Sequence, residues 1–126
     1  MKILKVTKNH KSESQVPLVA TKGEVVEGLE RETEWEGWLW CRNGSGIHGW
    51  VPRNYLDSAP ESGRFQFVQD YNSRELTIDA GQEVIVLDEE SGWAWVRTTL
   101  GEEGWIPQEN LEGLKDKPDS IPDLMG

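Results

Sequence analysis

The sequence predicts an all-β protein made of two copies of one small β unit. The chain of 126 residues contains Gly-Trp-Leu-Trp at 37–40 and Gly-Trp-Val-Pro at 49–52, and similar blocks recur 55 residues later, at 92–95 and 104–107. Six of the seven tryptophans lie in these blocks. A constant displacement between similar blocks indicates an internal repeat. A unit of about 55–60 residues has a small core and is only marginally stable alone.

Residues 38–42 and 93–97 follow the alternation of a β-strand. Successive side chains of a strand point to opposite faces, so one face of each segment has two tryptophans and an arginine. Two indoles per strand would overfill so small a core, and we expect the tryptophans on the outer face. These are Trp38, Trp40, Trp93 and Trp95. The side chains expected to point inward are Leu39, Cys41, Ala94 and Val96.

The outer tryptophans are expected to have two different roles. Trp38 and Trp93 stand at strand starts beside a loop, where an indole offers an apolar platform with an N–H donor, and we expect them to contact a ligand. The others are expected to form cross-strand pairs, which stabilise a sheet by about 0.2–1 kcal/mol each. The expected pairs are Trp40 with Trp50 and Trp95 with Trp105.

Glycine-rich turns separate the predicted strands. Gly23 and Gly81 supply the backbone freedom of a sharp turn before the next strand. A short linker at 57–63 contains serine, proline and glycine. We therefore expect three parts: a first domain at 1–57, a second domain at 64–114 and an irregular C-terminal tail at 115–126.

The formal net charge of −10 is unevenly distributed along the chain. Residues 1–57 contain eight Lys/Arg and eight Asp/Glu, whereas residues 58–126 contain five and fifteen. An acidic surface repels phosphate groups. The composition therefore argues against nucleic acid or an anionic membrane as a partner, and its simplest explanation is solubility.

The sequence shows no catalytic motif. We find no nucleophile placed with a base, no metal-ligand spacing and no phosphate loop, so we expect a protein that is not an enzyme and has no cofactor or metal. Cys41 is the single cysteine, which excludes an intrachain disulfide. The N-terminus lacks a signal-peptide pattern and no apolar run is long enough to span a membrane, so we expect a cytoplasmic protein.

The order of these motifs resembles the Src-homology 3 (SH3) fold, and their duplication is similar to bacterial SH3-domain proteins. In the second copy, Phe-Val-Gln-Asp-Tyr at 67–71 stands where the family has Ala-Leu-Tyr-Asp-Tyr, and Gly-Trp-Ile-Pro at 104–107 follows in family order. The first copy has Gly-Trp-Val-Pro-Arg-Asn-Tyr-Leu at 49–56. The resemblance covers about residues 3–114 and implies two tandem SH3-like five-stranded small barrels.

The resemblance also implies a shallow aromatic groove in each copy. In the family this groove is lined by two tyrosines of the first motif, a tryptophan, a proline and an Asn-Tyr pair. Neither copy has the complete set: Thr7 and Asn9 align nearest to the two tyrosines in copy one, and Gln69 replaces one of them in copy two. The residues expected to contact a ligand are Trp38, Pro52, Asn54 and Tyr55 in copy one, Tyr71, Trp93 and Pro107 in copy two, and Trp35 as a wall of the first groove.

The second copy departs from the family in one loop. Members that bind proline-rich peptides have a long acidic loop after the first motif, which grips an arginine or lysine of the ligand. Here only residues 72–75 separate Tyr71 from Leu76, too few to present an acidic cluster. Binding of proline-rich peptides in the polyproline conformation is therefore one candidate among several.

From these features we expect a non-catalytic module that presents two shallow aromatic grooves to an extended segment of a partner protein. Proline-containing and basic segments are the candidate ligands. Two alternatives stay open. One is recognition of glycan or cell wall by tryptophan stacking, and the other is a structural adaptor in which the two aromatic patches face each other and are buried.

Overall fold

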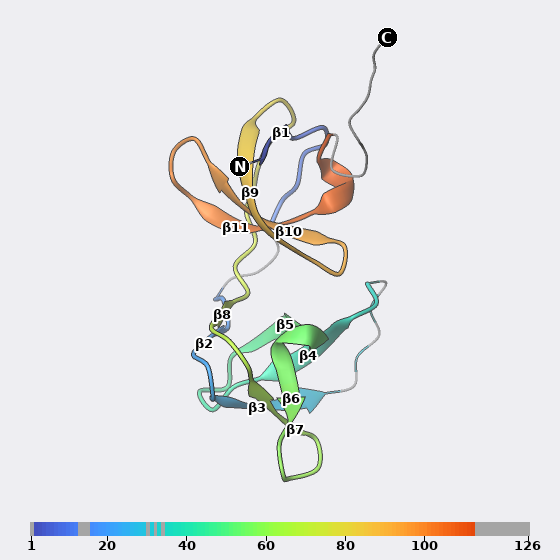
Figure 1. The fold of residues 1–126 in the computed structure, drawn as a ribbon, viewed down its shortest axis with the longest axis vertical. Helices are drawn as coiled ribbons and strands as arrows, with labels where there is room; N and C mark the ends of the chain where they lie inside the picture. The colour runs from blue at the N-terminus through green and yellow to red at the C-terminus, as the bar shows by residue number, and fades with distance from the viewer. Residues whose placement is uncertain (1, 13–15, 30, 32, 34, 113–126) are drawn as a thin grey trace. The chain divides into compact units, whose positions relative to one another are not determined.

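The structure, a computed structural model, describes residues 2–12, 16–29, 31, 33 and 35–112 of the chain. Its described elements are β-strands and short 3-10 helices, and the described residues include no α-helix. The chain forms two compact units (Figure 1). The continuous unit comprises Glu13–Glu75, and the discontinuous unit comprises Met1–Ser12 together with Leu76–Gly126.

The continuous unit has one five-stranded sheet and one two-stranded ladder. Its elements are β2 (Val19–Ala20), β3 (Val25–Leu29), β4 (Trp38–Arg42), β5 (His48–Pro52), the 3-10 helix η1 (Arg53–Tyr55), β6 (Leu56–Ser58), β7 (Arg64–Phe67) and β8 (Tyr71–Asn72). The larger sheet has the order β5-β4-β3-β7-β6, and β2 pairs with β8. All of these pairings are antiparallel.

The discontinuous unit has a four-stranded antiparallel sheet of order β1-β9-β10-β11. Its elements are β1 (Lys2–Lys5), β9 (Glu83–Glu90), β10 (Trp93–Thr98), β11 (Glu103–Pro107) and the 3-10 helix η2 (Gln108–Asn110). Figure 1 shows β1, in blue, beside β9, in yellow. The buried core of this unit consists of Val6, Leu76, Ile78, Val84, Ala94, Val96, Ile106 and Leu111.

The two units exchange the first strands of the sequence copies. By sequence β1 belongs to copy one, but it pairs with β9 of copy two. Likewise β7 belongs to copy two, but it lies between β3 and β6 of copy one, with Phe65 opposite Val26. The predicted domains, 1–57 and 64–114, therefore do not coincide with the compact units.

Equivalent hydrogen bonds hold the two exchanged segments. The N–H of Gly23 donates to the carbonyl of Phe67 (2.8 Å), and the N–H of Gly81 donates to the carbonyl of Val6 (2.7 Å). Both glycines have positive φ, 93° and 98°, as the predicted sharp turns require. Val6 and Phe67 are each 1% exposed. Each exchanged segment thus supplies a fully buried side chain, which contributes about 1.5–3 kcal/mol.

Side-chain size favours this pairing over the alternative in which each first strand stays with its own copy. A Cβ atom on Gly28 of β3 would lie 2.6 Å from Cε1 of Phe65, so the phenyl ring uses the space next to this glycine. The repeat offsets make Val86 the counterpart of Gly28 and Leu4 the counterpart of Phe65, and both pack against the core of the discontinuous unit. The alternative would place Phe65 beside Val86 and Leu4 beside Gly28. One unit would be overpacked and the other would have a void, and both defects destabilise.

The exchange also evens out the charge. The discontinuous unit has seven Lys/Arg and twelve Asp/Glu, and the continuous unit has six and eleven, so each has a formal charge of −5. The four lysines of Met1–Ser12 account for most of the change, and Lys2 pairs with Glu89 of β9 at 3.0 Å. An exposed ion pair of this kind contributes only about 0–1 kcal/mol. The larger effect is that the negative charge of copy two is diluted, which lowers self-repulsion.

The chain changes unit after Ser12 and again after Glu75. In the continuous unit the two ends are neighbours, because β2 pairs with β8 and the N–H of Ser73 donates to the carbonyl of Leu18 (3.0 Å). Chain ends that lie side by side tolerate the insertion of one domain into another. This topology explains the short segment 72–75, which we expected to be a shortened loop. It closes no loop within either unit and instead leads from one unit to the other.

The predicted strand faces are largely confirmed for the inward side chains. Cys41, Ala94 and Val96 are fully buried. Leu39 is only half-buried, and its Cδ2 lies 3.0 Å from the position of a Cβ atom on Gly28. Because Gly28 has no side chain, Leu39 can lie in the space beside it near the surface of the sheet, where the Leu39 side chain is only partly covered.

We expect the fragment Glu13–Glu75 to fold alone, because it contains every strand of the continuous unit. The fragment 64–114 matches one sequence copy but lacks β1 and the buried Val6, and we expect it to be unfolded. Circular dichroism and the dispersion of amide NMR signals of the two purified fragments check this. A cooperative unfolding transition in the fragment 64–114 would contradict the strand exchange.

Gly28→Ala should lower the free energy of unfolding by about 1–3 kcal/mol, because the added methyl group meets Phe65. The matched control is Gly44→Ala, where a Cβ atom has no heavy atom within 4 Å, and its effect should stay within about 0.5 kcal/mol. Urea unfolding measures both. Adding Phe65→Leu to Gly28→Ala should restore part of the loss. Equal stability of the two alanine variants would argue against β7 packing on β3.

Candidate functional site

Five of the predicted site residues lie in the continuous unit, and the strand exchange adds one of them, Tyr71, to four from copy one. Trp38 begins β4 and lies opposite Pro52, the last residue of β5. The helix η1 follows directly and contains Asn54 and Tyr55. Tyr71, which belongs to copy two by sequence, enters the same unit on β8. We call these five residues the aromatic cluster.

Aromatic contacts fix the position of Tyr71. Its ring meets Tyr55 edge to face with the centroids 5.3 Å apart, and it stacks on Phe67 at 5.9 Å. Its hydroxyl donates to the backbone carbonyl of Trp50 at 2.6 Å. Tyr71 thereby supplies the kind of aromatic ring that the first motif of copy one lacks. From the sequence we expected Tyr71 to share a groove with Trp93. This prediction is wrong, because β8 lies in the continuous unit and Trp93 lies in the discontinuous unit.

Most of the aromatic cluster is buried. The exposed fractions are 7% for Trp38, 6% for Tyr55 and 5% for Tyr71. Pro52 is buried as well, whereas Asn54 is exposed. The prediction that Trp38 lies on an outer face is wrong, because alternation assigns a side chain to one face of its strand without determining what packs on that face. The structure therefore has a closed cluster where the sequence predicts an open groove.

Burial changes the acidity of two groups in this region. It raises the pKa of the Tyr71 hydroxyl well above its ordinary value, and neighbouring Tyr55, Cys41 and Glu75 add to the effect. Burial also raises the pKa of the Cys41 thiol to about 12, against a smaller lowering by Arg53. Since the thiolate is the reactive form, Cys41 is an inert core residue, as predicted from its place in the strand.

The equivalent place in the discontinuous unit has different chemistry. Trp93 begins β10 opposite Pro107, the last residue of β11, and Trp93 is half-buried while Pro107 is buried. His10 meets Trp93 edge to face with ring centroids 5.6 Å apart. The side-chain amide of Asn110, which is 5% exposed, donates to the carbonyls of Lys8 and Asn9 at 3.3 Å each. Both tyrosines of the chain lie in the continuous unit, so no tyrosine is present here.

The sequence analysis missed His10. It is the structural counterpart of Tyr71, because His10 pairs with Ile78 as Tyr71 pairs with Ala20. The signal was present in the spacing: His10 follows the buried Val6 at the same distance as Tyr71 follows Phe67. The alignment by residue type selected Thr7 and Asn9 instead, since a histidine does not look like a first-motif tyrosine.

The predicted cross-strand tryptophan pairs are confirmed. Trp40 lies opposite Trp50 with ring centroids 5.0 Å apart. Trp95 lies opposite Trp105 with ring centroids 5.4 Å apart. Both pairs are edge to face, the geometry that the ring quadrupoles favour. They brace the two units at equivalent positions.

Polar and charged side chains contact these tryptophan pairs differently in the two units. In the continuous unit the guanidinium of Arg31 lies 4.2 Å from the ring centroid of Trp40, and His48 stacks on Trp40 at 5.7 Å. In the discontinuous unit the indole N–H of Trp95 donates to Glu103 at 3.0 Å. Hydrogen bonds from Arg97 and then from Trp95 lower the pKa of the Glu103 carboxyl.

Trp35, predicted to wall the first groove, is half-buried, and its backbone N–H donates to the hydroxyl of Thr33 at 3.0 Å. Within the ranges that the structure describes, no three His, Cys, Asp or Glu side chains are placed to hold a metal ion. The same residues include no helix long and apolar enough to cross a membrane.

The family described as variant SH3 domain matches the chain twice, at residues 3–57 and 64–113. The chain belongs to the variant SH3 family. No curated protein and no solved structure matched it. In this variant SH3 protein the family matches follow the sequence copies, whereas the compact units exchange first strands. SH3-like domains are commonly protein-interaction modules and are generally not catalytic.

Tyr71→Phe tests the buried hydroxyl. At neutral pH the variant should be less stable by about 0.5–1.5 kcal/mol, because it loses the hydrogen bond to the carbonyl of Trp50. The folded-state pKa of Tyr71 lies above the unfolded value of about 10, so its contribution is present below that pH and is lost as the pH rises through the folded pKa. The stability difference between wild type and variant should therefore shrink above pH of about 10.

Urea unfolding across alkaline pH measures this difference, and tyrosinate absorbance follows the ionisation directly because the chain has two tyrosines. Tyr55→Phe is the control that leaves Tyr71 in place. A stability difference that does not change with pH would contradict a buried, hydrogen-bonded hydroxyl at position 71.

Proposed function

We propose that this chain is a non-catalytic protein-binding module that holds an extended segment of a partner protein at the aromatic cluster. The observation that supports the proposal most directly is the arrival of Tyr71 beside Tyr55, in the unit that contains Trp38 and Pro52. One unit thereby acquires an aromatic set that neither sequence copy has. Flat rings beside a proline suit the packing of extended, apolar ligand residues.

The proposed ligand is a proline-containing or basic segment. Aromatic faces pack against the proline ring in the polyproline conformation and attract cationic side chains. The formal charge of −5 on each unit favours a basic segment over an acidic one at long range. Trp93 and Pro107 form a second, smaller proposed contact in the discontinuous unit, and Trp35 is proposed as an additional contact of the first.

The burial of the aromatic cluster sets a condition on this binding. Trp38, Tyr55 and Tyr71 are each at most 7% exposed, so a ligand reaches the rings only in a conformation that exposes them further. Binding then selects a minor conformation, and the apparent affinity falls by the fraction of molecules that occupy it. Tight binding therefore requires that the free energy of the contacts between the partner and the exposed rings exceed the free energy cost of opening the cluster.

The same burial supports a second candidate, a structural adaptor whose aromatic patches stabilise the protein itself. A buried tryptophan contributes several kcal/mol to a small unit regardless of any ligand. Recognition of glycan has less support at the outer pair, because Arg31 and His48 already engage Trp40. The two supported candidates differ in what the cluster does when a partner is present.

Trp38→Ala separates the two candidates, with Trp95→Ala as the matched control on the outer face of the other unit. The probe is an array of short peptides with proline-containing, basic and neutral members. A binding module should lose at least about tenfold in affinity for its selected peptides on Trp38→Ala and keep it on Trp95→Ala. Trp38→Phe keeps an apolar ring in the cluster and provides a folded variant if Trp38→Ala does not fold.

Indole N–H signals of Trp38 and Trp93 locate the bound peptide by NMR. Peptides that shift one or both signals support the binding role. If no peptide binds while Trp38→Ala lowers the free energy of unfolding by about 3–5 kcal/mol, the cluster is structural. Peptides that bind without moving either signal would show that the site assignment is wrong.

A further inference from the structure

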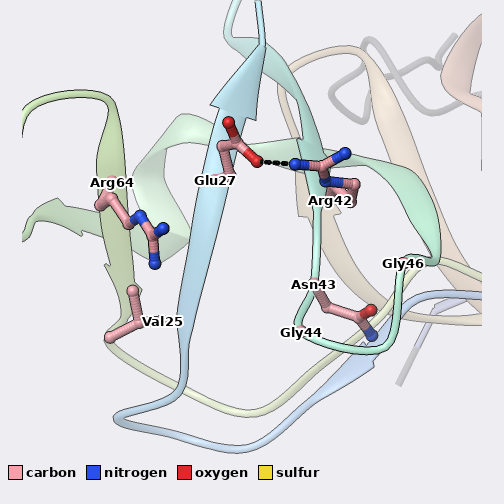
Figure 2. A pocket seen from close by; sticks show the side chains of 7 residues that line it. All are labelled: Val25, Glu27, Arg42, Asn43, Gly44, Gly46 and Arg64. Carbon is pink, nitrogen blue, oxygen red and sulfur yellow. Dashed lines mark hydrogen bonds and ion pairs between the residues drawn. The ribbon is translucent and has the colours of Figure 1, made fainter.

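The continuous unit has a polar pocket apart from the aromatic cluster. The pocket has a volume of about 300 Å³ and lies between β3, β4, the turn from β4 to β5, and β7 (Figure 2). Its lining residues are Val25, Glu27, Arg42, Asn43, Gly44, Gly46 and Arg64. A volume at the lower end for ligand sites suits one side chain rather than a whole small molecule.

Three charged side chains that line this pocket lie side by side on three adjacent strands, and we call them the charged row. Arg42 of β4 and Arg64 of β7 are both register partners of Glu27 on the central strand β3. Arg42 is hydrogen-bonded to Glu27, and Figure 2 shows the guanidinium of Arg64 reaching from β7 toward β3. The lining side chains thus have two positive charges and one negative charge. A local positive excess stands out in a chain with a net charge of −10.

Arg64 has only a weak partner of its own. Its Nε lies 3.5 Å from the carboxylate of Glu61, and the two side chains are 51% and 76% exposed. An ion pair this long and this exposed contributes little and gives way to a better acceptor. A guanidinium offers a planar set of donors that matches the two oxygens of a carboxylate. Arg64 is therefore placed to bind an incoming carboxylate while Arg42 stays paired with Glu27.

The turn at one side of the pocket is ordered and open. The side-chain oxygen of Asn43 accepts hydrogen bonds from the N–H groups of Ser45 (2.9 Å) and Ile47 (3.0 Å), which fixes the turn. A Cβ atom on Gly44 or Gly46 would have no heavy atom within 4 Å. The rim of the pocket is thus free of side-chain obstruction at these two positions, and a ligand backbone can approach the turn.

The equivalent register row in the discontinuous unit has different residues. It consists of Ile3, Ile85 and Arg97, so an isoleucine stands where the continuous unit has Arg64. Arg97 is held by Glu103 at 2.8 Å. The two units therefore differ in the positively charged side chains that would bind an anion at this position. The discontinuous unit provides an internal control.

We propose that this pocket binds a carboxylate of an acidic segment of a partner protein, with Arg64 as the main contact. The ligand carboxylate would replace Glu61 as the partner of Arg64. This site does not use the aromatic cluster, so the proposal is independent of the proposed function. The carboxylate can come from an aspartate or glutamate side chain or from a chain terminus, and the two sources share the same chemistry.

Amide NMR titration of the full chain with three short peptides tests the proposal. One capped peptide has a central glutamate, a second has glutamine in its place, and a third keeps the glutamine and ends in a free carboxylate. We expect the glutamate peptide to shift the signals of Gly44, Gly46 and the Arg64 side-chain N–H, and the capped glutamine peptide to leave them unchanged. Shifts with the third peptide would assign a chain terminus as an additional source.

Arg64→Gln should weaken binding of the glutamate peptide about tenfold, because it removes a charge-assisted contact. The control is Arg97→Gln, which removes the arginine of the corresponding register row in the other unit and should leave the affinity unchanged. Arg64→Lys keeps the charge without the planar donors and should fall between wild type and Arg64→Gln. Equal binding of the capped glutamate and glutamine peptides overturns the proposal. So do shifts confined to Trp38 and Tyr55, or equal affinity of the Arg64→Gln and Arg97→Gln proteins.

Discussion

The pairing of β1 with β9 and of β7 with β3 places the first strand of each repeat in the unit formed mainly by the other repeat. The rest of the molecule depends on this constraint. It supplies Val6 to one core and Phe67 to the other, gives both units the same formal charge, and delivers Tyr71 to the aromatic cluster. A tandem repeat whose copies folded separately would have the same local patterns without any of these properties.

Local periodicity was sufficient to predict the β class, the duplication and the inward position of Cys41, Ala94 and Val96. These features depend on residues close together in the sequence. The strand exchange could not be predicted in this way, because β1 and β7 have similar patterns and either pairing satisfies them. What favours one pairing is a contact between distant positions, in which Phe65 fills the space beside Gly28. Such complementarity becomes visible only when both strands are in place.

The candidate sites show the same limit. The aromatic residue types of the cluster were identified from sequence, but the burial of Trp38 and the placement of Tyr71 depend on the exchange. The polar pocket escaped the sequence analysis because Arg42 and Arg64 belong to different sequence copies and meet only across Glu27. The two units have thus kept one sheet architecture while their surfaces have diverged at equivalent positions.

Because the ribosome makes the chain from its N-terminal end, the exchanged β1 is synthesised long before the strand with which it pairs. Residues 2–5 emerge before the continuous unit, yet their partner β9 is completed only at residue 90, after the whole continuous unit has been made. Domains fold as units during synthesis, so the continuous unit can form before β9 exists. At ordinary translation rates β1 is without its partner strand for several seconds. Lys2 and Lys5 keep this waiting strand charged, which discourages pairing with other nascent chains.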